Sequence, residues 1–270
     1  MEVRFHPWPG RPGRLFTSLA PPIDGAFDAL VARIAPRVES ALPASVHAVR
    51  LEAPLKLIPE DWRVARRRFH RHLEEMGRTP GVVGLRLDVA DCYRSLRPEA
   101  VSRSVRTVAP EMGEWVAAAL GRLEDAGVIG LPVGPVASDV LANAVLLGVD
   151  RVLERLGIGW ARWVDDVLLV AESERALSIA ERETSRVLAE ASLRWNPAKR
   201  RPFDPARPPV AVTSRGPRRS AWGEASERGQ GGTIPRREGP WQPTDHANRI
   251  SRRTMRSSST STRPSRATQR

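Results

Sequence analysis

Apolar residues recur at intervals of three and four over five stretches of the chain, which is the spacing of one face of an α-helix. The expected helices cover residues 24–34, 61–76, 110–126, 138–156 and 173–191. In the third of these helices, the face expected to point inward consists of Trp115, Val116, Leu120 and Leu123. The chain is therefore predicted to contain several amphipathic helices that pack on a shared core.

Polar residues and glycines mark where these helices should begin and end. Asp24, Ser138 and Ser173 stand before apolar repeats, where a side-chain oxygen can accept hydrogen bonds from the free N–H groups of the first turn. Gly127 and Gly157 follow the last apolar residue of their repeats, a position where glycine commonly ends a helix. We expect the three polar residues to be N-caps and the two glycines to be helix stops.

Other apolar runs have the character of β-strands. Leu15–Leu19 is a short candidate, and Val82–Val89 is a buried one that carries Asp88 near its end. Two further segments flank a pair of aspartates at 165–166 and are expected to form a hairpin, with one more strand after the last helix. Residues 82–200 thus predict an α+β fold, in which an antiparallel sheet has helices packed on one face.

Composition divides the chain into two parts. Residues 1–200 contain 28 Lys+Arg and 26 Asp+Glu, a net charge of +2, whereas residues 201–270 contain 15 and 5, a net charge of +10. Periodicity stops near Pro202, and residues 203–270 are dominated by Arg, Ser, Thr, Pro and Gly. Such a segment buries too little apolar surface to offset the entropy of ordering, so residues 203–270 are expected to be a disordered basic tail.

The chain gives no sign of export or of membrane insertion. Its 270 residues contain no apolar run of the ~18 residues needed to span a bilayer, and no apolar signal segment follows Met1. Cys92 is the single cysteine, so no internal disulfide can form. We expect a cytoplasmic protein without a membrane partner.

Two adjacent aspartates at the edge of an apolar hairpin raise a question of charge. At about 4 Å and an effective dielectric near 20, two carboxylates repel by roughly 4 kcal/mol. Water, a raised pKa on one carboxyl, or a bound cation can relieve this repulsion. Since the segments around Asp165 and Asp166 are apolar, a divalent cation with oxygen ligands is favoured, with Asp88 as the third ligand. Two other interpretations stay open: an ordinary turn for the pair, and a helix cap for Asp88.

Four segments in a fixed order resemble the motifs of the reverse transcriptases. They are LRLDVADCYRSL for motif A, GLPVGPVASDVLANAVL for motif B, RWVDDVLLV for motif C and LRWNPAKR for motif D. Motif C alone is weakly specific, whereas four motifs in order at compatible spacing are strongly specific. The resemblance covers about residues 5–200. It implies part of the polymerase fingers over residues 1–80, a right-hand palm over residues 81–202, and no recognisable thumb before the tail at 203–270.

The resemblance also implies a catalytic centre and its partners. Asp88, Asp165 and Asp166 would be the catalytic and metal-binding residues for two Mg²⁺ ions, with Mn²⁺ as an alternative. The reaction would be RNA-directed DNA synthesis, a two-metal nucleotidyl transfer onto a 3′ hydroxyl or a protein hydroxyl. An RNA template, a DNA or RNA primer and dNTPs would be the partners, and a partner chain could supply a thumb.

Five further residues are implied to bind the nucleotide. Gly134 and Pro135 belong to the motif B loop, and Arg14 belongs to a segment that resembles a fingers strand. Arg14 would contact the triphosphate, Tyr93 would lie under the sugar, and Lys199 would neutralise or protonate the leaving group. The alternatives are a solvated turn arginine at 14, a core aromatic at 93 and a solvated lysine at 199.

The chain also departs from the family pattern. Val133 stands where many members have Gln in motif B, and Trp163 stands where motif C usually has Tyr. In having Val133 at this position, the chain resembles bacterial lineages that include those similar to the abortive-infection and phage-defence reverse transcriptases. After Lys199 no pattern of thumb helices follows. The tail is then either a basic nucleic-acid-binding arm or the out-of-frame translation of a GC-rich gene.

Two other functions compete with a reverse transcriptase. A truncated or frameshifted remnant of such an enzyme would at most bind nucleic acid. The near-neutral charge of residues 1–200 favours this, because polymerase channels carry a strong basic field. A metal-dependent nuclease could use the same carboxylates, but the motif B loop and helix would have no role in it.

Overall fold

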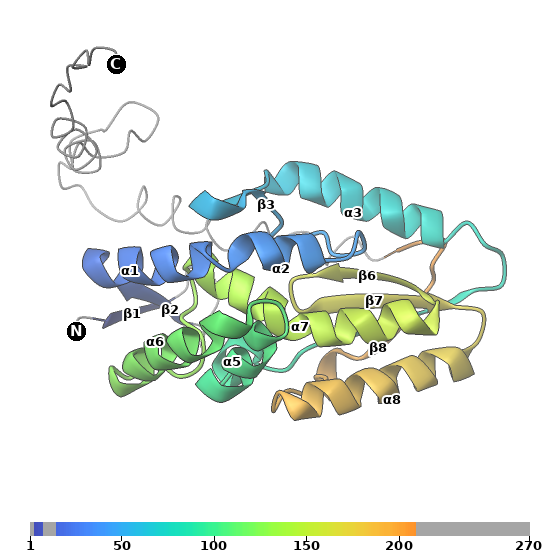
Figure 1. Ribbon diagram of the computed structural model, residues 1–270. Helices are drawn as coiled ribbons and strands as arrows, with labels where there is room; N and C mark the ends of the chain where they lie inside the picture. Colours follow the sequence, from blue (N-terminus) through green and yellow to red (C-terminus); the bar gives the residue numbers. More distant parts are fainter. Residues whose placement is uncertain (1–2, 8–14, 209–270) are drawn as a thin grey trace, which may run out of the picture. The chain divides into compact units, whose positions relative to one another are not determined.

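The computed structural model describes residues 3–7 and 15–208, and Figure 1 shows their helices and strands as a ribbon. These residues form helices and small antiparallel sheets, which confirms the predicted α+β class at that level. Arg14 lies outside the described residues. So do residues 209–270, which make up most of the expected tail. In the described part, no helix is long and apolar enough to cross a membrane.

A four-stranded antiparallel sheet carries the residues of interest. Its strands are β5 Val83–Asp88, β6 Gly159–Trp163, β7 Asp166–Ala171 and β8 Arg201–Phe203, in the order β6-β7-β5-β8. The strand expected over residues 82–89, the hairpin and the strand after the last helix are all present. Because β8 ends at Phe203, the sheet includes the first residue of the segment expected to be disordered.

A layer of helices covers one face of this sheet. Leu85 and Leu87 of β5 and Val167 and Leu169 of β7 join the main apolar core, and Figure 1 shows α7 and α8 running along the strands. The layer and its extension consist of α1 Pro21–Ala32, α2 Ala35–Ala41, α4 Cys92–Ser95, α5 Pro98–Arg106, α6 Gly113–Asp125, α7 Val136–Leu156 and α8 Glu174–Glu190. The helix α7 is buried along most of its length because other elements surround it.

The opposite face of the sheet is covered too, by α3 Trp62–Met76. Phe69 and Leu73 of α3 pack on Ala161, Trp163 and Leu168 of the hairpin in a second apolar cluster. The expectation of helices on one face only was therefore wrong. The hairpin is apolar without alternation after its aspartates, and a strand that is apolar on both sides needs cover on both sides.

Short hairpins complete the described chain. The strand predicted at Leu15–Leu19 is β2, and it pairs antiparallel with β1 Val3–Pro7. A second short pair consists of β3 Leu51–Ala53 and β4 Ile58–Pro59. Single 3₁₀ turns are η1 Pro54–Lys56, η2 Pro110–Met112 and η3 Pro197–Lys199. Sequence reasoning missed β1, β3, β4, α2, α4 and α5, and the strands among them are too short to show a clear alternation of apolar and polar residues.

Three of the five expected helix boundaries are confirmed. The Ser173 side chain accepts from Ala176 N and caps α8, and Gly127 and Gly157 follow α6 and α7 with positive φ. The expected N-cap at Asp24 is wrong because prolines at the start of α1 begin that helix three residues earlier. Ser138 is not a cap either.

The expected core positions hold with one exception in α6. Val116, Leu120 and Leu123 are buried, as predicted. Trp115 is 67% exposed, so its assignment to the inward face was wrong. The buried residues repeat at four and three positions and define a narrow stripe, and Trp115 lies one residue outside it.

Candidate metal centre

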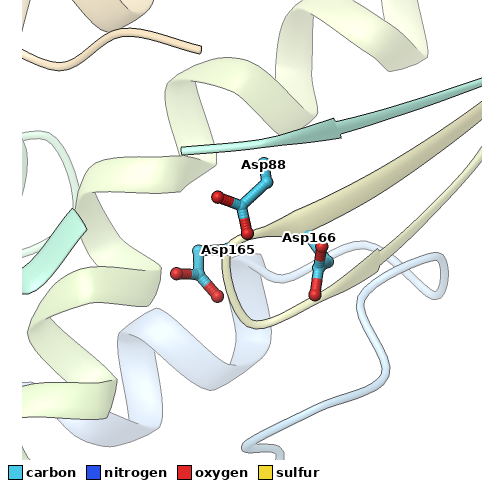
Figure 2. Close-up of side chains that lie close together, drawn as sticks. All are labelled: Asp88, Asp165 and Asp166. Atoms are coloured by element: carbon cyan, nitrogen blue, oxygen red, sulfur yellow. The ribbon is translucent and has the colours of Figure 1, made fainter. Parts of the chain in front are cut away.

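The strand register brings the three predicted aspartates together. Asp88 ends β5 and lies directly opposite Asp166, which begins β7. Asp165 precedes Asp166 in the turn of the hairpin. Figure 2 shows the three side chains converging, and each offers a carboxylate oxygen within 4.8 Å of the others. The prediction that Asp88 joins the Asp-Asp pair is confirmed as a matter of geometry.

The turn that presents Asp165 has an unusual backbone. Trp163 pairs with Asp166, so the two turn residues are Val164 and Asp165 rather than the two aspartates. Val164 has φ of 58°, in the left-handed region that disfavours β-branched residues. Such a conformation costs of order 1–3 kcal/mol and persists only where surrounding contacts enforce it. Strained residues of this kind concentrate at functional sites.

The segment resembling motif D is joined to the same end of the sheet by backbone hydrogen bonds. Asn196 N donates to Asp88 O at 2.7 Å, and Ala90 N donates to Arg194 O at 2.9 Å. Val89 N donates to Asp165 O at 3.1 Å and fixes the turn to the end of β5. These bonds hold residues 194–199 beside the carboxylates and so explain how Lys199 reaches them.

Two basic side chains neutralise two of the three carboxylates. Lys199 Nζ donates to both oxygens of Asp88, at 2.8 and 2.7 Å. Arg86 donates to Asp166 Oδ1 through Nη2 at 2.8 Å and through Nε at 3.2 Å. Asp165 accepts no side-chain hydrogen bond from the described residues. Among the described residues, the site therefore brings three acids and two bases together, and neither base bonds to Asp165.

Burial makes two of the acids, Asp88 and Asp166, hard to ionise. Burial raises the pKa of Asp166 to about 6, with a smaller contribution from the charges of Asp165 and Asp88, and Arg86 opposes the rise. Burial also raises the pKa of Asp88, against the opposing hydrogen bond from Lys199. Asp88 is 3% exposed. A cation placed among the three oxygens would remove this electrostatic cost.

The donor set fits a hard divalent cation. All three ligands are carboxylate oxygens, which Mg²⁺, Mn²⁺ and Ca²⁺ share as preferred ligands, so the set does not select among them. Lys199 stands where a cation would contact Asp88, and its side chain is 43% exposed. Its ammonium can therefore move into solvent when a cation takes over its two bonds to the buried Asp88 carboxylate, which makes the site compatible with a metal.

Metal binding should weaken steeply in acid. Because the pKa of Asp166 is raised to about 6, this carboxyl is protonated below that pH and must lose its proton to become a ligand. We expect the dissociation constant for Mn²⁺ to rise about tenfold for each pH unit below 6. Titration of the protein with Mn²⁺ by electron paramagnetic resonance from pH 5 to 8 measures this. A flat profile would contradict a role for Asp166 as a ligand.

The raised pKa of Asp166 also affects the stability of the metal-free protein. A carboxyl with a raised folded pKa binds its proton more tightly in the folded than in the unfolded state. The stability that Asp166 contributes is thus lost as pH rises from about 4 to about 6. Added Mn²⁺ should restore that stability above pH 6 and have little effect at pH 5.

Removing the competing lysine should tighten metal binding. In Lys199→Met the ammonium no longer occupies both oxygens of Asp88. We expect the affinity for Mn²⁺ at pH 8 to rise several-fold, roughly 3- to 10-fold, since an opposing charge is worth about one kcal/mol at such a half-exposed site. Arg200→Met is the matched control, because Arg200 contacts Glu181 and not the aspartates. Equal affinities for both variants and the wild type would contradict competition.

The loop that resembles motif B contacts the first short hairpin. Thr17 N donates to Val133 O at 2.7 Å, and a Cβ on Gly134, whose φ is +135°, would lie 3.3 Å from Thr17 O. Pro135 stands immediately before α7. Gly134 and Pro135, both predicted to bind nucleotide, therefore lie in the connection between the loop's contact with β2 and the start of the long helix α7.

Tyr93, the residue predicted to lie under the sugar, is part of the core in this structure. It is buried in α4, and its hydroxyl donates to Asp139 of α7. Its carbonyl accepts from Leu131 N at 2.8 Å, so it also anchors the loop. The alternative of a core aromatic describes Tyr93 here. Arg14, the other predicted contact, lies outside the described residues.

Substitutions at two glycines test how tightly the loop that resembles motif B is packed. Gly130 has φ of +72°, and an added Cβ would lie 2.2 Å from Tyr93 O, whereas Gly127 has φ of +89° and open space around it. We expect Gly127→Ala to cost about 1–2 kcal/mol from backbone strain alone. Gly130→Ala should cost about 1–3 kcal/mol more, because the loop must move away from Tyr93. Urea unfolding of both variants measures the difference, and equal losses would contradict close packing of the loop.

Sequence reasoning missed the basic partner of Asp166. Arg86 lies two residues before Asp88 on a strand, so the two side chains share a face, and this period was a usable signal.

Comparison with known proteins assigns no family. No protein-family model matches the chain, and no curated protein matches it. Its function must therefore be inferred from the arrangement of the described residues.

Proposed function

We propose that this chain is a reverse transcriptase, an RNA-directed DNA polymerase that transfers nucleotides onto a 3′ hydroxyl. One observation carries the proposal: Asp88, Asp165 and Asp166 meet at the ends of two adjacent antiparallel strands, within 4.8 Å of one another. A turn, a solvated cluster or a helix cap would not require three acids to converge from segments nearly eighty residues apart. The order of the four motif-like segments agrees with this function.

The acidic and basic residues of the site have different roles in the proposed reaction. Asp88, Asp165 and Asp166 would hold Mg²⁺, which supplies charge neutralisation and an activated hydroxyl when bound. Lys199 leaves Asp88 and brings its ammonium to the departing pyrophosphate, where positive charge favours bond cleavage. Arg86 stays on Asp166 and holds that carboxylate in place. The burial that raises the pKa of Asp88 and Asp166 also excludes water from the reacting groups.

One observation favours a second candidate, a nucleic-acid-binding protein without turnover. Lys199 and Arg86 already neutralise two of the three carboxylates, as they would in a site that no longer takes a metal. Residues 1–200 also carry a net charge of only +2. Such a protein would hold nucleic acid and would show no metal-dependent extension.

Primer extension on a defined template separates the candidates. The full chain is incubated with Mg²⁺, dNTPs and a labelled DNA primer annealed to an RNA of mixed sequence, beside the same primer on DNA. The proposal predicts extension on RNA whose sequence follows the template. A shortened primer would indicate a nuclease instead. A gel shift without extension, in Mg²⁺ and in Mn²⁺, would indicate the binding protein.

A further inference from the structure

A buried arginine lies directly behind the turn that carries Asp165. Arg162 is 0% exposed and donates to Asp150 through Nε at 2.8 Å and through Nη2 at 2.6 Å. Its Nη1 donates to Asn143 Oδ1 at 2.8 Å and to Val164 O at 2.9 Å. Asp150 is fully buried and Asn143 nearly so, both on α7. The guanidinium therefore joins the long helix to the backbone of the turn.

The same network holds two strained valines. Val164 and Val49 have φ of 58° and 57°, and β-branched residues rarely take this conformation. Arg162 donates to the carbonyl of Val164, and Asn143 Nδ2 donates to the carbonyl of Val49 at 3.3 Å. Both strained peptide groups are thus held by side chains that also bond to each other. The network satisfies the condition under which strain of this kind persists.

We propose that Arg162, held by Asp150 and Asn143, is a positioning residue that fixes the Val164–Asp165 turn and so sets the place of the Asp165 carboxylate. This inference rests on the proposed function for its consequence in catalysis. Arg162 touches none of the reacting groups. It acts through the carbonyl of Val164, the residue immediately before Asp165.

The choice of a buried ion pair at this position supports the proposal. A buried ion pair is often no more stabilising than well-packed apolar residues of the same volume. An apolar pair on α7 and β6 could not donate to the carbonyl of Val164. Lysine could not replace Arg162 either, because three separate acceptors receive the planar guanidinium at once.

The proposal can be tested with variants that keep the strained backbone of Val164 and variants that relieve it. The first pair is Arg162→Lys and the double variant Arg162→Met, Asp150→Leu, which removes the charges together. Each is also made with Val164→Gly, because glycine takes the left-handed conformation without support. The readouts are the affinity for Mn²⁺ alone, and hydrogen exchange of Val89 N–H, which donates to Asp165 O at 3.1 Å. Glu181→Leu, Arg200→Met is the control, an exposed ion pair away from the turn.

We expect both Arg162 variants to bind Mn²⁺ about 10- to 100-fold more weakly than the wild type, the usual effect of losing a group that orients a ligand. Exchange at Val89 should quicken at least about tenfold in the metal-free variants. In proteins that carry Val164→Gly, removing Arg162 should lower the affinity for Mn²⁺ by about threefold or less relative to Val164→Gly alone. The control pair should leave both readouts unchanged.

Two results would overturn the inference while leaving the proposed function in place. One is wild-type affinity and exchange in both Arg162 variants. The other is an equal loss with and without Val164→Gly, which would make Arg162 a purely structural residue. If the wild type itself binds no Mn²⁺, the proposed function fails, and the exchange data alone still decide whether Arg162 holds the turn.

Discussion

Asp165→Asn is expected to abolish nucleotide incorporation while making the metal-free protein more stable. Asn has the shape of Asp but lacks the negative charge that a divalent cation requires. A metal contributes several kcal/mol to transition-state charge stabilisation, so the rate should fall by about 10³-fold or more. Labelled dTTP incorporation measures this loss.

The gain in stability has the same electrostatic origin. The charge of Asp165 raises the pKa of both Asp88 and Asp166, and removing it makes their ionisation easier. At the separations within this cluster we expect roughly 1–3 kcal/mol of stabilisation at pH 8 without metal. Thermal unfolding in a chelator measures the gain. Asp125→Asn is the control, since Asp125 is exposed at the end of α6.

Opposite shifts in activity and stability identify a functional acid rather than a structural one. A residue that merely stabilised the turn would lose both together when replaced. Full incorporation by Asp165→Asn, or a large drop in its melting temperature, would contradict the assignment of Asp165 as a metal ligand.

Arg162→Met is expected to destabilise the fold strongly, by about 3–5 kcal/mol, because it leaves Asp150 buried without its partner. Burial already raises the pKa of Asp150, and Arg162 is the main group opposing that rise. Without the arginine the carboxyl should take up a proton, so the loss of stability should be smaller at pH 5 than at pH 8. For a folded part of this size the melting temperature should fall by roughly 6–20 °C.

A double variant at Arg162 and Asp150 distinguishes an electrostatic loss of stability from a loss caused by poorer packing. Arg162→Met with Asp150→Leu should recover most of the lost stability, since no unpaired charge remains. Its melting temperature should also depend on pH no more than that of the wild type, whose remaining dependence comes from groups such as Asp166. If the double variant is as unstable as the single one, the cost comes from packing and the electrostatic explanation is wrong.

The acids of the site could be predicted because each stands at the end of an apolar run. Asp88 closes one such run, and Asp165 and Asp166 precede another, so pairing of the two strands had to bring them close. Lys199 was expected near the reaction centre from its place in a motif, and backbone bonds from residues 194–196 to the end of β5 deliver it there. These predictions depend on strand ends, which local sequence marks well.

The remaining features depend on contacts between distant segments. Nothing around Arg162 indicates that it is buried, because its partners Asp150 and Asn143 lie on a helix whose packing the sequence does not specify. Tyr93 was open between two roles because its environment depends on where α7 places Asp139. Arg86 is different: the two-residue period of a strand already placed it beside Asp88, and that signal was overlooked.

The most direct test of a catalytic triad at Asp88, Asp165 and Asp166 is dTTP incorporation on poly(rA)/oligo(dT) by the full chain in Mg²⁺. The double variant Asp165→Ala, Asp166→Ala is measured beside it, with circular dichroism of both proteins as the control for folding. We predict incorporation by the wild type and none by the variant. Equal incorporation by both proteins, or none by the folded wild type in either Mg²⁺ or Mn²⁺, would contradict the proposed function.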